Sequence, residues 1–124
     1  MSTILIVEDN EKNMKLARDV LQARGYATLE AVTGEEGVRL AIDRKPDLVL
    51  MDIQLPGING MEALRQVRAD PGCADIPVVA FTASVTPTDR SQISAAGFDA
   101  FISKPINLKE FLETVRRLLE GGGA

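Results

Sequence analysis

The chain has 124 residues, which suits one domain with one core, and its 45% hydrophobic and 26% charged residues exclude a disordered or fibrous protein. A net charge of −4 argues against a free-standing nucleic-acid binder, and the lack of an apolar run of roughly 18 residues excludes a transmembrane helix. The absence of histidine excludes Ser-His-Asp or Cys-His catalysis and His-ligated metals, and the single cysteine, Cys73, favours a reducing cytoplasm.

Five short apolar runs predict the strands of a parallel sheet. Four of them are almost continuous in apolar residues, as is typical of strands covered on both faces. The run at 26–31 is more polar and alternating, so we place it at a sheet edge. In chain order, the predicted strands are Ile4–Val7, Tyr26–Ala31, Leu48–Met51, Ile76–Phe81 and Ala100–Ile102.

Amphipathic stretches separate these runs and have the period and the end signals of helices. Thr33 and Glu36 have the spacing of a capping box at the start of the second helix. The fourth stretch has little apolar content, so we expect that helix to have low local stability. The helices are expected between Asn10 and Gly25, between Thr33 and Pro46, between Asn59 and Asp70, from Thr86-Pro87 onward, and between Asn107 and Gly121.

Alternation of strand and helix five times predicts right-handed crossovers and an α/β fold with a doubly wound parallel sheet. For five strands we expect the flavodoxin-like order 2-1-3-4-5. We expect one domain over residues 2–120, followed by a flexible tail over residues 121–124.

Reactive side chains stand at the ends of four of the predicted strands. Glu8 and Asp9 follow the first strand, and Asp52 follows the third. Thr82 ends the fourth strand and Lys104 the fifth. Ligands of such sheets bind at the carboxyl ends of the strands, at the switch point between strands 1 and 3. We therefore expect these five side chains to lie close together.

Three carboxylates and one ammonium group leave this cluster with a charge of −2. A like-charge pair about 4 Å apart costs about 4 kcal/mol at an effective dielectric constant near 20, so the cluster favours a divalent cation. Oxygen ligands without His or Cys select Mg²⁺ or Mn²⁺. Any one acid alone could be an ordinary loop residue, but the whole set favours a site.

A strand-end carboxylate can also attack phosphorus and form an acyl phosphate. This reaction needs positioning and charge neutralisation, which Lys104 and a metal would supply, and the Thr82 hydroxyl can hydrogen-bond a phosphoryl oxygen. Pro105 leaves two alternatives for the preceding peptide bond, a cis bond that re-aims Lys104 or a trans turn.

The segments LIVEDN, LVLMDIQLPGINGME, VVAFTA and FISKPI resemble the receiver domain of two-component response regulators, and the resemblance runs from Ile4 to Leu119. It implies the CheY-like form of the fold. It also implies that Asp52 accepts a phosphoryl group from a phosphohistidine on a histidine kinase or phosphotransfer protein, with Mg²⁺ as cofactor. Within the family, the chain is most similar to a stand-alone regulator of cell division.

The resemblance also implies the roles of single residues. The metal would be bound by Asp9, by Asp52, by the backbone carbonyl of Gln54, and by Glu8 through water. The phosphoryl group would be bound by Thr82, Ala83 and Lys104. Thr82 and Phe101 would be the switch pair, and Phe101 replaces the commoner tyrosine, so its switch works through packing alone. Gln54 and Ser84 would face the attacking water, which implies a moderately long-lived phosphoryl state.

The expected partners follow from the same resemblance. A kinase or phosphotransfer protein would dock on the first helix and the active-site edge. An effector would bind the face of the fourth helix, fifth strand and fifth helix. We expect no nucleic-acid or membrane partner, and a monomer or weak dimer in the cytoplasm, without enzyme activity beyond its own phosphoryl transfer and slow dephosphorylation.

The sequence bears on four alternatives to a stand-alone phosphorylated receiver. In a flavodoxin the first strand–helix loop binds the FMN phosphate, but here the loop is acidic, from Glu8 to Glu11. A haloacid-dehalogenase-like phosphatase needs a second acid two residues after Asp52, where this chain has Gln54, and a cap domain for which there is no room. The intact acid, Thr and Lys set disfavours a receiver that works without phosphorylation. A receiver excised from a hybrid histidine kinase stays open, although the starting methionine and the absence of a flanking linker favour a stand-alone chain.

Overall fold

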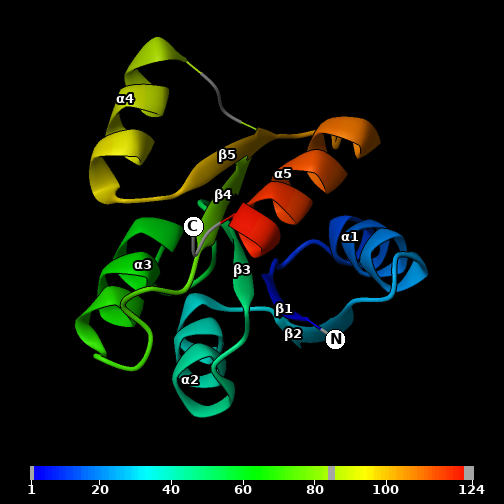
Figure 1. The fold of residues 1–124 in the computed structure, drawn as a ribbon. Helices are drawn as coiled ribbons and strands as arrows, with labels where there is room; N and C mark the ends of the chain where they lie inside the picture. Colours follow the sequence, from blue (N-terminus) through cyan, green and yellow to red (C-terminus); the bar gives the residue numbers. More distant parts are fainter. Residues whose placement is uncertain (1, 84–85, 122–124) are drawn as a thin grey trace.

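The structure is a computed structural model that describes residues 2–83 and 86–121. Its centre is a parallel sheet of five strands in the order β2-β1-β3-β4-β5, which confirms the predicted order (Figure 1). The strands are β1 (Thr3–Val7), β2 (Ala27–Ala31), β3 (Leu48–Asp52), β4 (Val78–Thr82) and β5 (Ala100–Ser103). The helices are α1 (Glu11–Ala23), α2 (Gly34–Arg44), α3 (Gly60–Ala69), α4 (Pro87–Ala96) and α5 (Leu108–Gly121).

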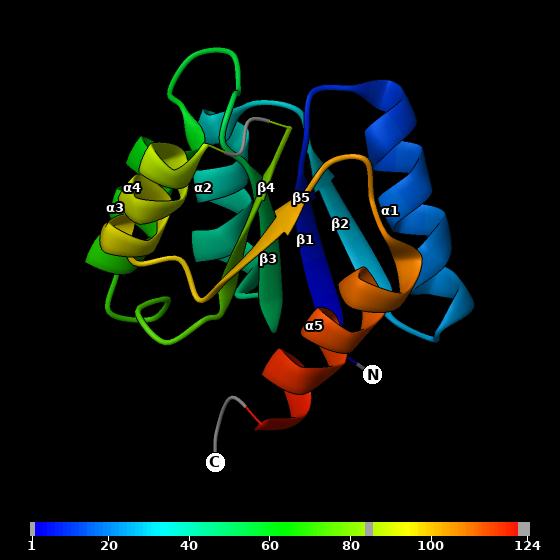
Figure 2. The same ribbon diagram turned by 90° about the horizontal axis from the view of Figure 1, so that it is seen from above.

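Helices cover both faces of the sheet and enclose two hydrophobic cores (Figure 2). One core lies under α1 and α5, the other under α2 and α3, and α4 lies beside α3. β1, β3 and β4 contribute to both cores, because alternate side chains of a strand point to opposite faces. This explains why the predicted strands are nearly continuous in apolar residues, and the polar strand β2 lies at an edge as expected.

Side-chain caps at four helix starts confirm the predicted helix signals. Asn10, Thr33, Asn59 and Asn107 each accept a hydrogen bond, at 2.9–3.1 Å, from the backbone N–H three residues later. Gly25, with φ of 89°, follows the end of α1, as expected of a glycine at a helix end. Local signals therefore fix where these helices begin.

Some boundaries differ from the prediction. α2 ends at Arg44 with Lys45, whose φ of 46° is left-handed, as its C-cap, which agrees with the predicted end before Pro46. β4 begins at Val78 instead of Ile76, because the chain at 70–77 is a loop. α5 includes Gly121, which was expected beyond the helix, and residues 122–124 of the expected tail lie outside the described residues. No helix in the described part of the chain has the length and apolar character needed to cross a membrane.

Arg68, the penultimate residue of α3, ties down the turn that follows α4. Its guanidinium donates to the carbonyls of Ala74, Ile76 and Gly97, and to Asp99 Oδ2 at 2.7 Å. Asp99 Oδ2 also accepts from the N–H of Val78 at 2.8 Å. These bonds join the end of α3, the loop after it, the start of β4 and the turn between α4 and β5.

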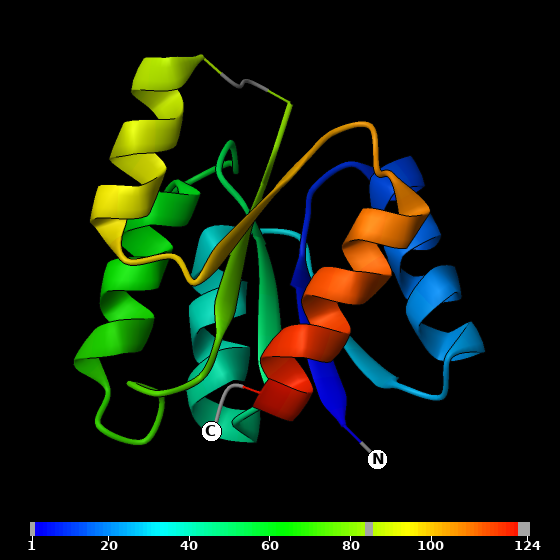
Figure 3. The same cartoon turned by 45° about the horizontal axis from the view of Figure 1, so that its top comes forward.

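α4 has little other anchorage, as expected from its sequence. Ile93 is the buried residue among its described side chains. Figure 3 shows α4 beside α3, with its first turn toward the edge where the strands end. Its low local stability stays a prediction, because few apolar contacts are a cause of local opening and not a measure of it.

Candidate functional site

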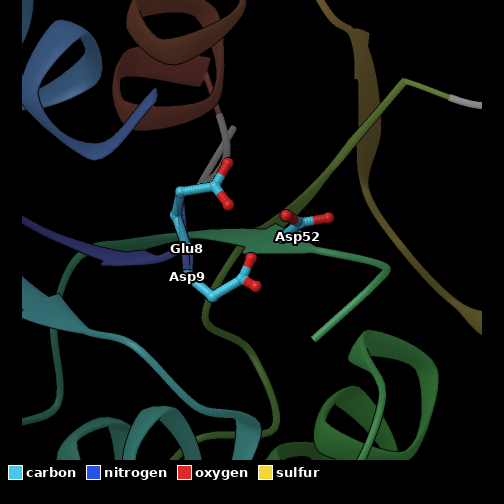
Figure 4. A group of neighbouring side chains, drawn as sticks. All are labelled: Glu8, Asp9 and Asp52. Carbon is cyan, nitrogen blue, oxygen red and sulfur yellow. The ribbon is translucent and has the colours of Figure 1, made fainter. Parts of the chain in front are cut away.

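Three carboxylates meet where β1 and β3 end. Glu8 and Asp9 directly follow β1, Asp52 is the last residue of β3, and their carboxylates point toward one another (Figure 4). One oxygen from each lies within 4.8 Å of the others. The convergence follows from the topology, because β1 and β3 are neighbours in the sheet. The sequence-based expectation that these acids lie together is therefore confirmed.

Lys104 brings the positive charge that the sequence predicted. Its Nζ lies 2.7 Å from Glu8 Oε1 and 2.8 Å from Asp52 Oδ2. The backbone N–H of Lys104 donates to the carbonyl of Thr82 at 2.8 Å, which fixes the residue just beyond β5. The Lys104–Pro105 peptide bond is cis, the first of the two alternatives that the sequence left open.

Burial sets the electrostatics of the cluster. The side chains of Glu8 and Asp52 are 0% and 4% exposed, and that of Lys104 is 15% exposed. Burial and then the neighbouring Asp52 raise the pKa of Glu8 from 4.5 to about 7, and Lys104 and the N–H of Asn10 offset this only in part. Burial opposes the charge of Lys104, but hydrogen bonds to Asp52 and Glu8 outweigh it and raise its pKa.

The donor atoms fit Mg²⁺. Glu8 Oε1 is buried, and among the described residues its partner is the Lys104 ammonium group, 2.7 Å away. Backbone N–H groups of Asn10 and Gln54 hold Glu8 Oε2 and Asp52 Oδ1 at 3.1 and 3.0 Å. A cluster of charge −2 that offers only oxygen is short of positive charge, and a small hard cation supplies it.

The other predicted residues lie at the same edge or on the strand beside it. Thr82 is 2% exposed, ends β4 and pairs with Ser103 of β5. Asp52 pairs with Phe81, the residue before Thr82 in β4. Ala83 follows and is exposed, and Ser84 lies outside the described residues. Phe101 is half-buried in β5. Thr82 and Ala83 are thus close in the fold to the acids, and Phe101 is farther down its strand.

Sequence reasoning missed two side chains that act on these elements. The guanidinium carbon of Arg90, on α4, lies 5.3 Å from the centre of the Phe101 ring. Glu35, on α2, reaches the loop between β3 and α3 and accepts from the N–H of Ile58 at 3.4 Å. Neither residue ends a strand or caps a helix, so no pattern in the sequence points to them.

A doubly wound sheet with a strand-end acid cluster and an ion-paired lysine is the architecture of a phosphorylation-controlled signalling domain. The sequence profile of the response regulator receiver domain matches residues 4–116, and the chain belongs to this family. This agrees with the resemblance noted in the sequence, and nothing favours the flavodoxin or phosphatase alternatives.

Individual similar proteins give more detail than the family alone. The chain is 44% identical over 117 residues to the polar-differentiation response regulator DivK of Brucella anthropi, which covers 94% of this chain and 95% of that protein. A receiver domain of a sensor histidine kinase from Pseudomonas aeruginosa, with a magnesium ion coordinated in its active site cleft, has a TM-score of 0.90 at 31% identity, covering 96% of this chain and 98% of that one. The chemotaxis protein CheY4 of Vibrio cholerae has a TM-score of 0.90 at 26% identity, covering 96% and 99%.

Proposed function

We propose that this protein is the phosphoacceptor of a two-component phosphorelay and that Asp52 is the residue phosphorylated. An oxygen of Asp52 attacks the phosphorus of a phosphohistidine on a histidine kinase or phosphotransfer protein. A P–O bond forms as the P–N bond breaks, and the imidazole leaves. The observation that carries this proposal is the buried Asp52 carboxylate, with Lys104 Nζ 2.8 Å from one of its oxygens.

Each residue of the edge has a part in the proposal. The N–H of Gln54 fixes Asp52 Oδ1 at 3.0 Å and so orients the nucleophile. Lys104 neutralises charge on the phosphoryl oxygens, and Thr82 and Ala83 donate hydrogen bonds to them. Asp9, Asp52, the carbonyl of Gln54 and, through water, Glu8 would hold Mg²⁺, with Mn²⁺ as a substitute. When bound, the metal supplies further positive charge at the transferred group.

The phosphoryl group would be read out through packing. Thr82 turns toward it and Phe101 moves into the space released, which changes the face formed by α4, β5 and α5. We propose that an effector docks on this face and that the donor protein docks on α1 and the active-site edge. Gln54 and Ser84 favour a moderately long-lived phosphoryl state.

The cellular role is proposed from the DivK relatives. Their 44% identity favours a stand-alone regulator of the cell cycle or cell division over a receiver of a hybrid kinase. Such a protein acts in the cytoplasm by binding other proteins as a monomer or weak dimer. It does not act on nucleic acid or membranes, and it catalyses only its own phosphorylation and slow dephosphorylation.

Intact-mass spectrometry tests the central step. Purified protein incubated with acetyl phosphate or phosphoramidate and Mg²⁺ should gain one phosphoryl group, about 80 Da. The gain should be lost with a chelator and in the variant Asp52→Ala, and kept in Asp75→Ala, which removes an exposed loop carboxylate. An unmodified wild-type protein, or equal modification of Asp52→Ala, would refute the proposal.

A further inference from the structure

The loop between β3 and α3, residues 53–59, has little freedom on the side that faces the sheet. The N–H of Gly60 donates to the carbonyl of Ile53 at 2.9 Å and closes the loop. A Cβ atom at Gly60 would overlap the carbonyl oxygen of Asp52 and lie 2.8 Å from the Cα of Ile53. Only glycine lets the loop return this close to the backbone of the proposed phosphoacceptor.

The first turn of α2 holds the same loop from the opposite side. A Cβ atom at Gly34 would lie 2.5 Å from the carbonyl oxygen of Ile58, so the two backbones are in direct contact. The carboxylate of Glu35 lies over Gly57, where an added Cβ would meet both carboxylate oxygens at 2.5 Å. Glu35 Oε2 also accepts from the N–H of Ile58 at 3.4 Å. The loop is therefore packed between the end of β3 and the start of α2.

We propose that Glu35 is a positioning residue for the metal site, because it holds the loop that presents the carbonyl of Gln54. The inference deepens the proposed function and rests on it. A backbone carbonyl binds a metal well only when its loop is ordered in advance, since ordering it during binding has an entropic cost that weakens affinity. Glu35 supplies this order from outside the ligand set, through Gly57 and Ile58.

Isothermal titration with Mg²⁺, at a temperature where circular dichroism shows every variant to be folded, tests this role. We expect Glu35→Ala to weaken binding by roughly tenfold, as is common when a group that orients a ligand is lost. Glu36→Ala, one residue further along the same helix, removes the same charge and should bind within about twofold of wild type. Glu35→Gln keeps an acceptor for the N–H of Ile58 and should restore most of the affinity.

Two glycines offer a second, matched comparison. Gly57 and Gly25 have φ angles of 77° and 89°, but an added Cβ at Gly25 meets nothing within 4 Å. Alanine at either position strains the backbone, and only Gly57→Ala also strikes the Glu35 carboxylate. We expect Gly57→Ala to weaken Mg²⁺ binding and Gly25→Ala to leave it unchanged. In the combined Glu35→Ala and Gly57→Ala variant, the loss should be smaller than the product of the single losses.

The outcomes separate the two proposals. If wild type binds no Mg²⁺, the proposed metal site fails and this inference fails with it. If wild type binds Mg²⁺ and Glu35→Ala matches Glu36→Ala, only the positioning role of Glu35 is overturned. Amide hydrogen exchange without metal gives an independent reading, because Glu35→Ala should speed exchange in residues 53–59 and Glu36→Ala should not. Equal exchange in the two variants would also overturn the role.

Discussion

Replacing Glu8 with glutamine should stabilise the metal-free protein at pH 8 and change its stability little at pH 4. The Glu8 side chain is fully buried, and burial, with Asp52 beside it, raises its pKa from 4.5 to about 7. Between these two values the folded protein keeps a proton that the unfolded chain has lost. The free energy of unfolding therefore falls as the pH rises through this range.

The magnitude follows from the two pKa values of Glu8. They differ by about 2.5, and each unit is worth about 1.4 kcal/mol, so ionising Glu8 costs the folded state about 3 kcal/mol by pH 8. Glutamine has the same shape and no proton to lose. The variant Glu8→Gln should therefore exceed wild type in stability by up to about 3 kcal/mol at pH 8. Mg²⁺ bound at the proposed site would favour the ionised carboxylate, so saturating Mg²⁺ should remove the difference.

Urea unfolding followed by circular dichroism, from pH 4 to pH 8, with a chelator or with Mg²⁺, measures this difference. The control is Glu113→Gln, which neutralises an exposed carboxylate on α5 and should follow the wild-type pH dependence. Wild-type and Glu8→Gln stabilities that change in parallel over the whole range in chelator would refute the account of a crowded, buried carboxylate.

Three further substitutions test other features. Asp52→Asn should raise the unfolding midpoint in chelator, because it removes one charge from a cluster of charge −2, and a lower midpoint would count against the crowding. Arg68→Ala should cost about 1–2 kcal/mol in urea unfolding, because the part-buried carbonyl of Ile76 and the carboxylate of Asp99 lose a donor; a cost below about 0.5 kcal/mol would show that the network adds little. Arg90→Ala should lower stability by only about 0.5–1 kcal/mol, the value of an exposed cation–π contact with Phe101, and a cost of several kcal/mol would mean that Arg90 has another role.

The sequence predicts the site well because its geometry depends on topology. Parallel strands place their carboxyl ends at one edge, so Glu8, Asp52 and Lys104 could be brought together from strand ends alone. The helix caps can also be predicted from the sequence, because a capping side chain acts within one turn of its own helix. Local sequence patterns are therefore sufficient to predict which residues end a strand or cap a helix.

The features that were missed depend on contacts between distant segments. Ile76 is apolar and looks like part of a strand, yet its carbonyl accepts from Arg68 and the strand starts later. Glu35 contacts Ile58, which is 23 positions away in the sequence. Neither the helical period of apolar residues nor the position of strand ends predicts a contact of this kind. Contacts by which a side chain holds a loop or an aromatic ring from a neighbouring helix therefore cannot be predicted from local sequence patterns.

The hydrogen bonds of Arg68 lie at one end of α4, the end that leads into β5. The turn after α4 is fastened to α3 and β4, and within the described side chains of the helix Ile93 alone is sunk into the protein. A helix that is fastened at one end can tilt about that end. α4 begins at Pro87, near the edge where phosphate would arrive, so we expect a shift at that edge to tilt the helix about its fastened end.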